Sequence, residues 1–143
     1  MMRLFCYCCI VLLVACNSPK KKEIAKKETT YKMYKPSEMA NLMNDMYLLN
    51  EKVKTQILEG ETLDEFPTEF LKIHSAKLTR SSDRDEFFNN FSQLYISQEK
   101  EIYNASKIDL VVKYNNAINT CISCHQQKCT GPIPKIKKLL IQE

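Results

Sequence analysis

The sequence predicts an all-α fold, an antiparallel up-down-up-down four-helix bundle. Three observations lead to this prediction. The chain of 143 residues has the length of one domain and contains only two glycines, too few for the tight turns of a small β domain. From residue 37 onward, apolar residues recur at steps of three and four, as they do along one face of a helix. The linkers between these segments are short, so successive helices are expected to run in opposite directions.

Two helices are predicted in the first half of this domain. The first follows Ser37, which suits an N-cap, and stops near Gly60, which suits a left-handed C-cap. Its apolar residues are Met39, Leu42, Met43, Met46, Leu49, Val53 and Ile57. The second begins near Pro67, because the first turn of a helix tolerates proline. Its inward side is predicted to carry Phe66, Phe70, Ile73, His74 and Leu78.

Two further helices complete the predicted bundle. The third opens after residues 81–83, with Phe87, Phe88, Phe91, Leu94, Tyr95 and Ile102 facing inward. The fourth starts at Ser106, where Asp109 three residues later forms a capping box. Its inward residues are Ile108, Val111, Tyr114, Asn115, Ile118, Cys121, Ile122 and His125. Gly131 and two prolines then break the helix, and residues 135–141 are expected to form a short amphipathic turn on the bundle.

The N-terminus has the layout of a secretory signal peptide. One arginine is followed by an uncharged run of twelve residues and by the sequence Leu-Val-Ala-Cys, which resembles the bacterial lipobox. The run is too short to span a bilayer as a helix. We therefore expect residues 1–15 to be removed, Cys16 to be lipidated, and residues 16–36 to tether a domain of residues 37–143 to a bacterial membrane, on its periplasmic or outer-surface side. The alternative is an ordinary buried apolar segment.

The charge of the chain excludes one class of partner. A formal net charge of +4 is too small to predict nucleic-acid binding. Most of the excess lies in lysines of the expected tether, which we interpret as solvated: Lys20, Lys21, Lys22, Lys26 and Lys27. Attraction of these lysines to anionic lipid is secondary, and the lipid anchor is the expected membrane contact.

The segment Cys121-Ile-Ser-Cys124-His125 is the haem-attachment pattern of c-type cytochromes. Two thiols at this spacing add to the two vinyl groups of haem, and the adjacent histidine then reaches the iron. The pattern also explains the cysteine count. Of seven cysteines, only Cys121, Cys124 and Cys129 would remain as thiols after processing, and three thiols cannot all pair within one chain. The sequence thus predicts one haem c near the end of the last helix, with Cys129 left over.

Three other interpretations of this motif are weaker. A thioredoxin-like redox pair should open a helix after a strand, whereas this motif closes a long helix. A zinc site could use Cys121, Cys124, His125 and Cys129, but exported zinc–thiolate sites are uncommon and nothing else indicates a zinc knuckle. The third interpretation is a chance match to a pattern of five residues. Haem is favoured because the motif, the export signal and the helical pattern agree.

A helical bundle with this motif at the end of its last helix resembles cytochrome c-prime and its low-spin relatives. The resemblance covers roughly residues 37–128 and lies in the order of elements and the place of the motif. It implies a haem along the bundle core, His125 as proximal iron ligand, and a residue early in the first helix, often Met, facing the iron. Met43 is then the candidate sixth ligand, and its rivals are Met39, Met46 and His74.

The sequence departs from this family in two places. Gln126 and Gln127 stand where the family usually has a basic residue just after the motif. The tail with Cys129, Gly131, Pro132 and Pro134 is also unlike the family, which leaves the exposed edge of the haem unassigned.

The expected function is electron transfer by a membrane-tethered monohaem cytochrome, not enzyme catalysis, with redox proteins of the respiratory chain as partners. The alternative is a gas-binding protein with an open distal site for nitric oxide or carbon monoxide. A haem peroxidase ranks last, because it needs a distal acid/base pair and His74 is the only spare histidine. Homodimerisation stays open.

Overall fold

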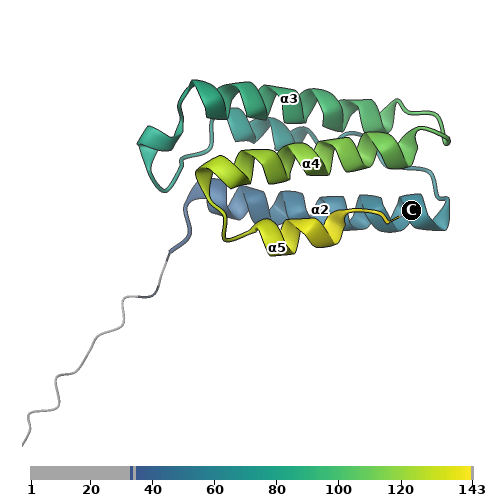
Figure 1. The fold of residues 1–143 in the computed structure, drawn as a ribbon, viewed down its shortest axis with the longest axis horizontal. Helices are drawn as coiled ribbons and strands as arrows, with labels where there is room; N and C mark the ends of the chain where they lie inside the picture. Colours follow the sequence, from purple (N-terminus) through teal and green to yellow (C-terminus); the bar gives the residue numbers. More distant parts are fainter. Residues whose placement is uncertain (1–32, 34, 143) are drawn as a thin grey trace, which may run out of the picture. The chain divides into compact units, whose positions relative to one another are not determined.

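The computed structural model describes Met33 and residues 35–142, and over these residues the chain is helical or irregular, without a strand. The all-α class is therefore confirmed. The predicted signal peptide, the lipidation site Cys16 and most of the tether lie outside the described residues. None of the described helices is long and apolar enough to cross a membrane. The elements, where η marks a 3₁₀-helix, are α2 (Glu38–Glu59), η1 (Thr68–His74), η2 (Ser81–Asp83), α3 (Glu86–Tyr103), α4 (Leu110–Lys128), α5 (Ile133–Ile136) and η3 (Lys137–Leu139) (Figure 1).

The ends of α2 lie where the sequence predicts them. The Ser37 hydroxyl accepts a hydrogen bond from the Ala40 amide at 3.1 Å, which caps the first turn. Gly60 ends the helix in the left-handed region with φ of 70°, a conformation that favours glycine because it has no Cβ. The predicted first helix is confirmed.

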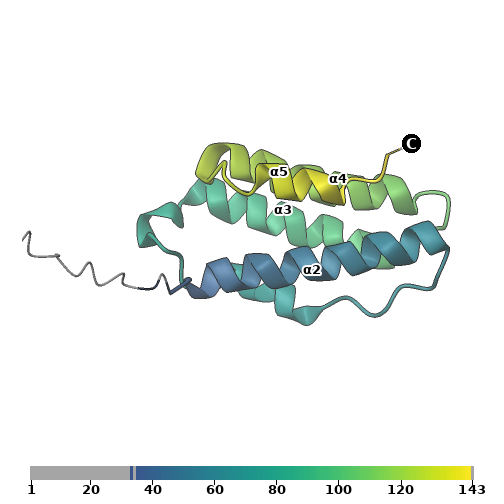
Figure 2. The same cartoon turned by 90° about the horizontal axis from the view of Figure 1, so that it is seen from below.

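Three long helices, α2, α3 and α4, lie side by side and enclose the core (Figures 1 and 2). Ion pairs join α3 and α4 at both ends: Lys113 with Glu101 at one end, and Lys128 with Asp85 at the other. These two helices therefore run in opposite directions. The largest fully buried apolar side chains are Phe70, Ile102, Tyr114 and Ile118.

The second predicted helix is wrong in type and length. Only residues 68–74 are helical, as the 3₁₀-helix η1, and the chain from Ser75 to Arg80 is irregular. The helix ends early because of Arg84. Its guanidinium donates to the carbonyl oxygens of His74 at 2.8 Å, Ala76 at 2.7 Å and Ile73 at 3.3 Å. These carbonyls thus obtain partners without a further helical turn, and a side chain ten residues away ends the helix.

Arg84→Ala is expected to destabilise the fold by about 2–3 kcal/mol, because it removes three hydrogen bonds from a charged donor to backbone carbonyls, two of them part-buried. The guanidinium also lies 5.0 Å from the centre of the Phe88 ring. Urea unfolding followed by circular dichroism measures the change. Arg80→Ala is the matched control, since its guanidinium pairs only with Asp83 near the surface and should cost less than about 1 kcal/mol. Equal losses in both variants would contradict this role for Arg84.

The third and fourth predicted helices exist but begin later than expected. Asp85 caps α3 by accepting from the Phe88 amide at 2.9 Å, and the serines before it form η2. Ser106 and Asp109 bond to each other at 2.7 Å in a turn, and α4 starts only after them. Three residues predicted to face inward are exposed instead: His74, Leu94 and Ile108.

The C-terminal tail packs on the bundle, as expected, through Ile136, Leu139 and Ile141. Two side chains hold its backbone. The Asn115 amide exchanges two hydrogen bonds of 2.9 Å with the backbone of Ile141, and the Lys54 ammonium donates to the carbonyls of Lys138 and Leu140. The tail is therefore tied to both α4 and α2.

Candidate functional site

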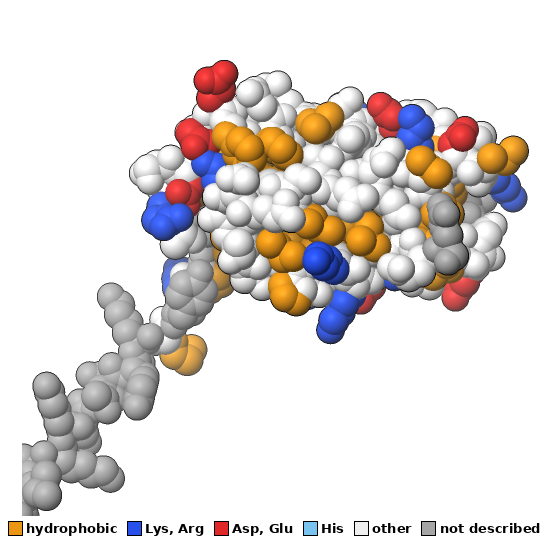
Figure 3. All heavy atoms as spheres, viewed as in Figure 1, with side chains coloured by type: hydrophobic (Ala, Val, Ile, Leu, Met, Phe, Trp, Pro, Cys, Tyr) orange, Lys and Arg blue, Asp and Glu red, His pale blue; other side chains and the backbone are white. Residues whose placement is uncertain are grey.

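A cavity of about 580 Å³ lies between α2, α4, the chain around residues 78–83 and the C-terminal tail. This volume is in the range that cofactor sites occupy in proteins. Most of the lining is apolar, with Phe88 and Tyr95 from α3, Ile118 from α4 and Leu139 from the tail. Figure 3 shows hydrophobic side chains reaching the surface over α4 and α5, beside positively charged ones. The molecule thus offers a large, mostly apolar space.

The predicted attachment motif faces this cavity. Cys121, Cys124 and His125 all line it, from the last two turns of α4. Residues at positions i, i+3 and i+4 share one face of a helix, so a single helix presents both thiols and the imidazole together. Both thiols are unpaired and partly buried. The structure therefore brings together the three residues that a covalent haem requires.

His125 is held in the orientation and protonation state that a metal ligand needs. Its ring nitrogen Nδ1 lies 3.1 Å from the carbonyl oxygen of Cys129, which can only accept, so Nδ1 carries the proton and Nε2 keeps its lone pair. The Cys129 amide donates back to the His125 carbonyl at 3.0 Å. Burial lowers the pKa of His125, which favours the neutral ring. Cys129 also lies close through its Sγ, 3.2 Å from Nδ1.

The alternative readings of the motif fit this environment poorly. Burial raises the pKa of Cys121 and raises that of Cys124 to about 11, so both are protonated thiols at neutral pH. A thioredoxin-like pair relies on a lowered thiol pKa. Among Met33 and residues 35–142, no three Cys, His, Asp or Glu side chains converge as a metal site.

The candidates for a sixth iron ligand separate into two groups. Met39, Met43 and Met46 line the cavity together with the motif. Met43 and Met46 also line an adjoining hollow of about 40 Å³ beside Cys121, Cys124 and His125, which Met39 does not reach. His74 lines neither space, is exposed, and has its Nδ1 3.3 Å from the Ser92 hydroxyl. The structure favours a methionine over His74.

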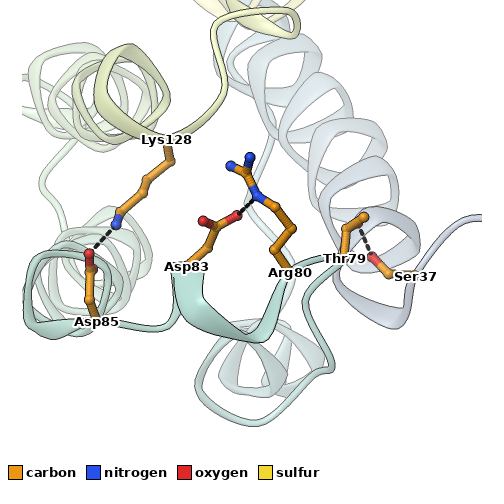
Figure 4. A network of polar contacts seen from close by, with 6 residues as sticks. All are labelled: Ser37, Thr79, Arg80, Asp83, Asp85 and Lys128. Atoms are coloured by element: carbon orange, nitrogen blue, oxygen red, sulfur yellow. Dashed lines mark hydrogen bonds and ion pairs between the residues drawn. The ribbon is translucent and has the colours of Figure 1, made fainter.

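A polar rim that sequence reasoning did not identify borders one end of the cavity (Figure 4). The side chains of Lys128 and Arg80 extend into the space between α4, α2 and the start of α3, where Lys128 pairs with Asp85 and Arg80 donates to Asp83 at 3.0 Å. The hydrogen bond from Lys128 lowers the pKa of Asp85. Beside them the Thr79 hydroxyl donates to that of Ser37 at 3.1 Å. The two cations of this rim can hold acidic groups of a ligand. Because the rim residues come from separate parts of the sequence, only the folded structure shows that they lie together.

A buried polar cluster adjoins the opposite part of the cavity. The Asn50 side-chain amide donates to the Met46 carbonyl at 3.0 Å and to the Tyr95 hydroxyl at 3.1 Å. Its oxygen Oδ1 is buried without a partner, and Asn50 lines the cavity. Glu99, one turn beyond Tyr95 on α3, is 0% exposed, and neither carboxylate oxygen has a hydrogen-bond partner. Sequence reasoning missed both residues.

No protein-family model, curated protein or solved structure matches this chain. The resemblance to cytochrome c-prime therefore remains an expectation from the motif and the predicted order of helices.

Proposed function

We propose that this protein is a monohaem c-type cytochrome that transfers electrons while tethered to a membrane, and that it is not an enzyme. One observation carries the proposal: both thiols of the motif and a histidine with an available Nε2 line one apolar cavity of about 580 Å³. Haem c, once bound, supplies an iron that takes up and releases one electron.

The residues around the cavity have distinct tasks in this proposal. Cys121 and Cys124 would form the thioethers, and Nε2 of His125 would bind the iron. The Cys129 carbonyl would orient the imidazole through Nδ1, as partners of metal-bound histidines do. Arg80 and Lys128 would hold the two propionate carboxylates in place of their present partners Asp83 and Asp85. The apolar wall would exclude water from the iron.

The proposal includes the up-down-up-down bundle, with η1 and its flanking segments in the place of the second helix. The opposite directions of α3 and α4 support this arrangement. It also includes the lipid on Cys16, an exported location on a bacterial membrane, and redox proteins as partners. The export signal and the haem motif support each other here, since c-type haem attachment takes place outside the cytoplasm.

The proposal is tested by producing the full chain in a bacterial host that attaches haem c. We expect a haem stain that survives denaturing electrophoresis, a mass increased by one haem, and a six-coordinate low-spin spectrum that carbon monoxide leaves unchanged. A chain that carries no haem under these conditions would refute the proposal. A five-coordinate, high-spin iron that binds carbon monoxide would support the gas-binding alternative instead.

Met43→Ala is expected to abolish the near-infrared charge-transfer band of a Met-ligated ferric haem, because Met43 lines the cavity beside His125. His74→Ala is the matched comparison and should leave the band and the reduced spectrum unchanged, since His74 lies outside the cavity lining. The near-infrared and visible spectra of both variants measure this. A band that persists in Met43→Ala would pass the ligand role to Met46 or Met39, and bis-histidine signals lost in His74→Ala would overturn the choice of methionine.

A further inference from the structure

Glu99 is a buried acid without a counter-charge, in the polar cluster beside the cavity. It is 0% exposed, and neither of its carboxylate oxygens has a partner in hydrogen-bonding geometry. Burial raises its pKa from 4.5 to about 8, and the facing Tyr95 hydroxyl offsets this only in part. A buried acid without a partner destabilises the fold, so its presence calls for an explanation.

Within the described part of the chain, no cation acts on the Glu99 carboxyl. Tyr95 and Tyr103 of its own helix and Tyr114 and Cys121 of α4 all have their pKa raised, by burial first and by the Glu99 charge second. From α2 the neutral amide of Asn50 contacts the cluster through Tyr95. More distant acids act on these tyrosines and not on Glu99 itself: Glu51 on Tyr114 and Asp64 on Tyr103.

Two residues that respond to the Glu99 charge, Tyr95 and Cys121, line the cavity. Cys121 is also one of the two residues that would carry the haem. Charges in a surrounding of low dielectric interact strongly, because little water screens them. A change of charge in the cavity is therefore transmitted to the Glu99 carboxyl.

We propose that Glu99 is a redox-linked proton-binding site: its carboxylate takes up one proton from solvent when the iron gains one electron from a redox protein, and releases that proton when the electron leaves. The proposal rests on the proposed haem. The added electron makes the cavity more negative, so the carboxylate is less favourable beside it and the proton is held more tightly. The negative charge of the added electron is balanced by the positive charge of the proton.

The reduction potential as a function of pH tests this coupling in the full haem-loaded chain. The wild-type potential should fall as pH rises through about 8, where Glu99 titrates, and Glu99→Gln should lose most of this dependence. A tenfold difference in proton affinity between the two oxidation states corresponds to about 59 mV for a one-electron couple. Glu101→Gln is the matched control, because Glu101 is an exposed carboxyl on the same helix, paired with Lys113, and should keep the wild-type dependence. Equal pH dependence in Glu99→Gln and wild type would overturn the coupling.

A second measurement separates this inference from the proposed function. In the haem-free full chain labelled with ¹³C at glutamate carboxyls, one signal should titrate several pH units above the others and be missing from the spectrum of Glu99→Gln. A Glu99 signal that titrates with the exposed glutamates would overturn the proton site, whether or not haem binds. A high-titrating Glu99 in a chain that never takes up haem would instead refute the proposed function and leave the site as a proton-binding group alone.

Discussion

Replacing both Cys121 and Cys124 with alanine is expected to abolish covalent haem attachment. In the proposed cytochrome each thiol would form one thioether, and without either thiol only the His125 bond to iron and contacts with the cavity wall would remain. Those contacts do not survive denaturation. The variant should therefore lose its haem to acidified acetone and its haem stain after denaturing electrophoresis, whereas the wild type keeps both.

Cys129→Ser is the control for this experiment. It removes the third thiol of the described chain but keeps the backbone carbonyl that accepts from His125, so haem attachment and the visible spectrum should match the wild type. Full retention of haem in the Cys121→Ala/Cys124→Ala variant would refute the covalent assignment. A changed spectrum in Cys129→Ser would show that its sulfur, 3.2 Å from the ring nitrogen, influences the iron.

Glu99→Gln is expected to change how stability depends on pH, and to raise stability at alkaline pH. Folding raises the pKa of Glu99 from 4.5 to about 8, so the folded chain binds this proton more tightly than the unfolded chain. The stabilisation is complete below the unfolded value and is lost as pH rises through about 8, with a slope of up to about 1.4 kcal/mol per pH unit. Glutamine does not titrate, so the variant should lack this slope.

Urea unfolding at several pH values between about 5 and about 9 measures this difference in the full chain. Glu101→Gln should keep the wild-type slope, because the Glu101 carboxyl is exposed and paired with Lys113. Parallel stability curves for wild type and Glu99→Gln would show that the Glu99 carboxyl ionises as easily in the folded chain as in the unfolded chain.

The first helix was predictable because its signals are local. A serine whose hydroxyl caps the first turn and a glycine that ends the last turn both act within a few residues of the helix ends. The apolar residues between them repeat often enough to define one face. Met39, Leu42, Met46 and Val53 are buried there as expected.

The second helix was not predictable because its end is determined from a distance. Phe70 and Ile73 are buried as the pattern indicates, but the helix stops where Arg84 takes the carbonyls that another turn would have used. A side chain that binds backbone groups ten residues earlier leaves no periodic signal in the sequence. His74 was consequently expected to face inward and is exposed.

The sequence predicts the chemical groups of the candidate site but not most of the groups that surround them. The motif identified Cys121, Cys124 and His125, and helix spacing placed them on one face. The carbonyl that orients His125 belongs to the backbone of Cys129, and any residue would supply it, so no sequence pattern marks it. Glu99 did leave a signal that was overlooked, since the buried positions 88, 92, 95, 99 and 102 of α3 repeat at steps of four and three.

The C-terminal tail can dock only after other parts of the chain have folded. It follows the motif in the chain, and it supplies one wall of the cavity through Pro132, Ile136 and Leu139. The side chains that hold it stand on two different helices, so its docking place exists only once α2 and α4 have come together. Until then the cavity that Cys121, Cys124 and His125 line lacks that wall, so docking of the tail is the step that closes the cavity.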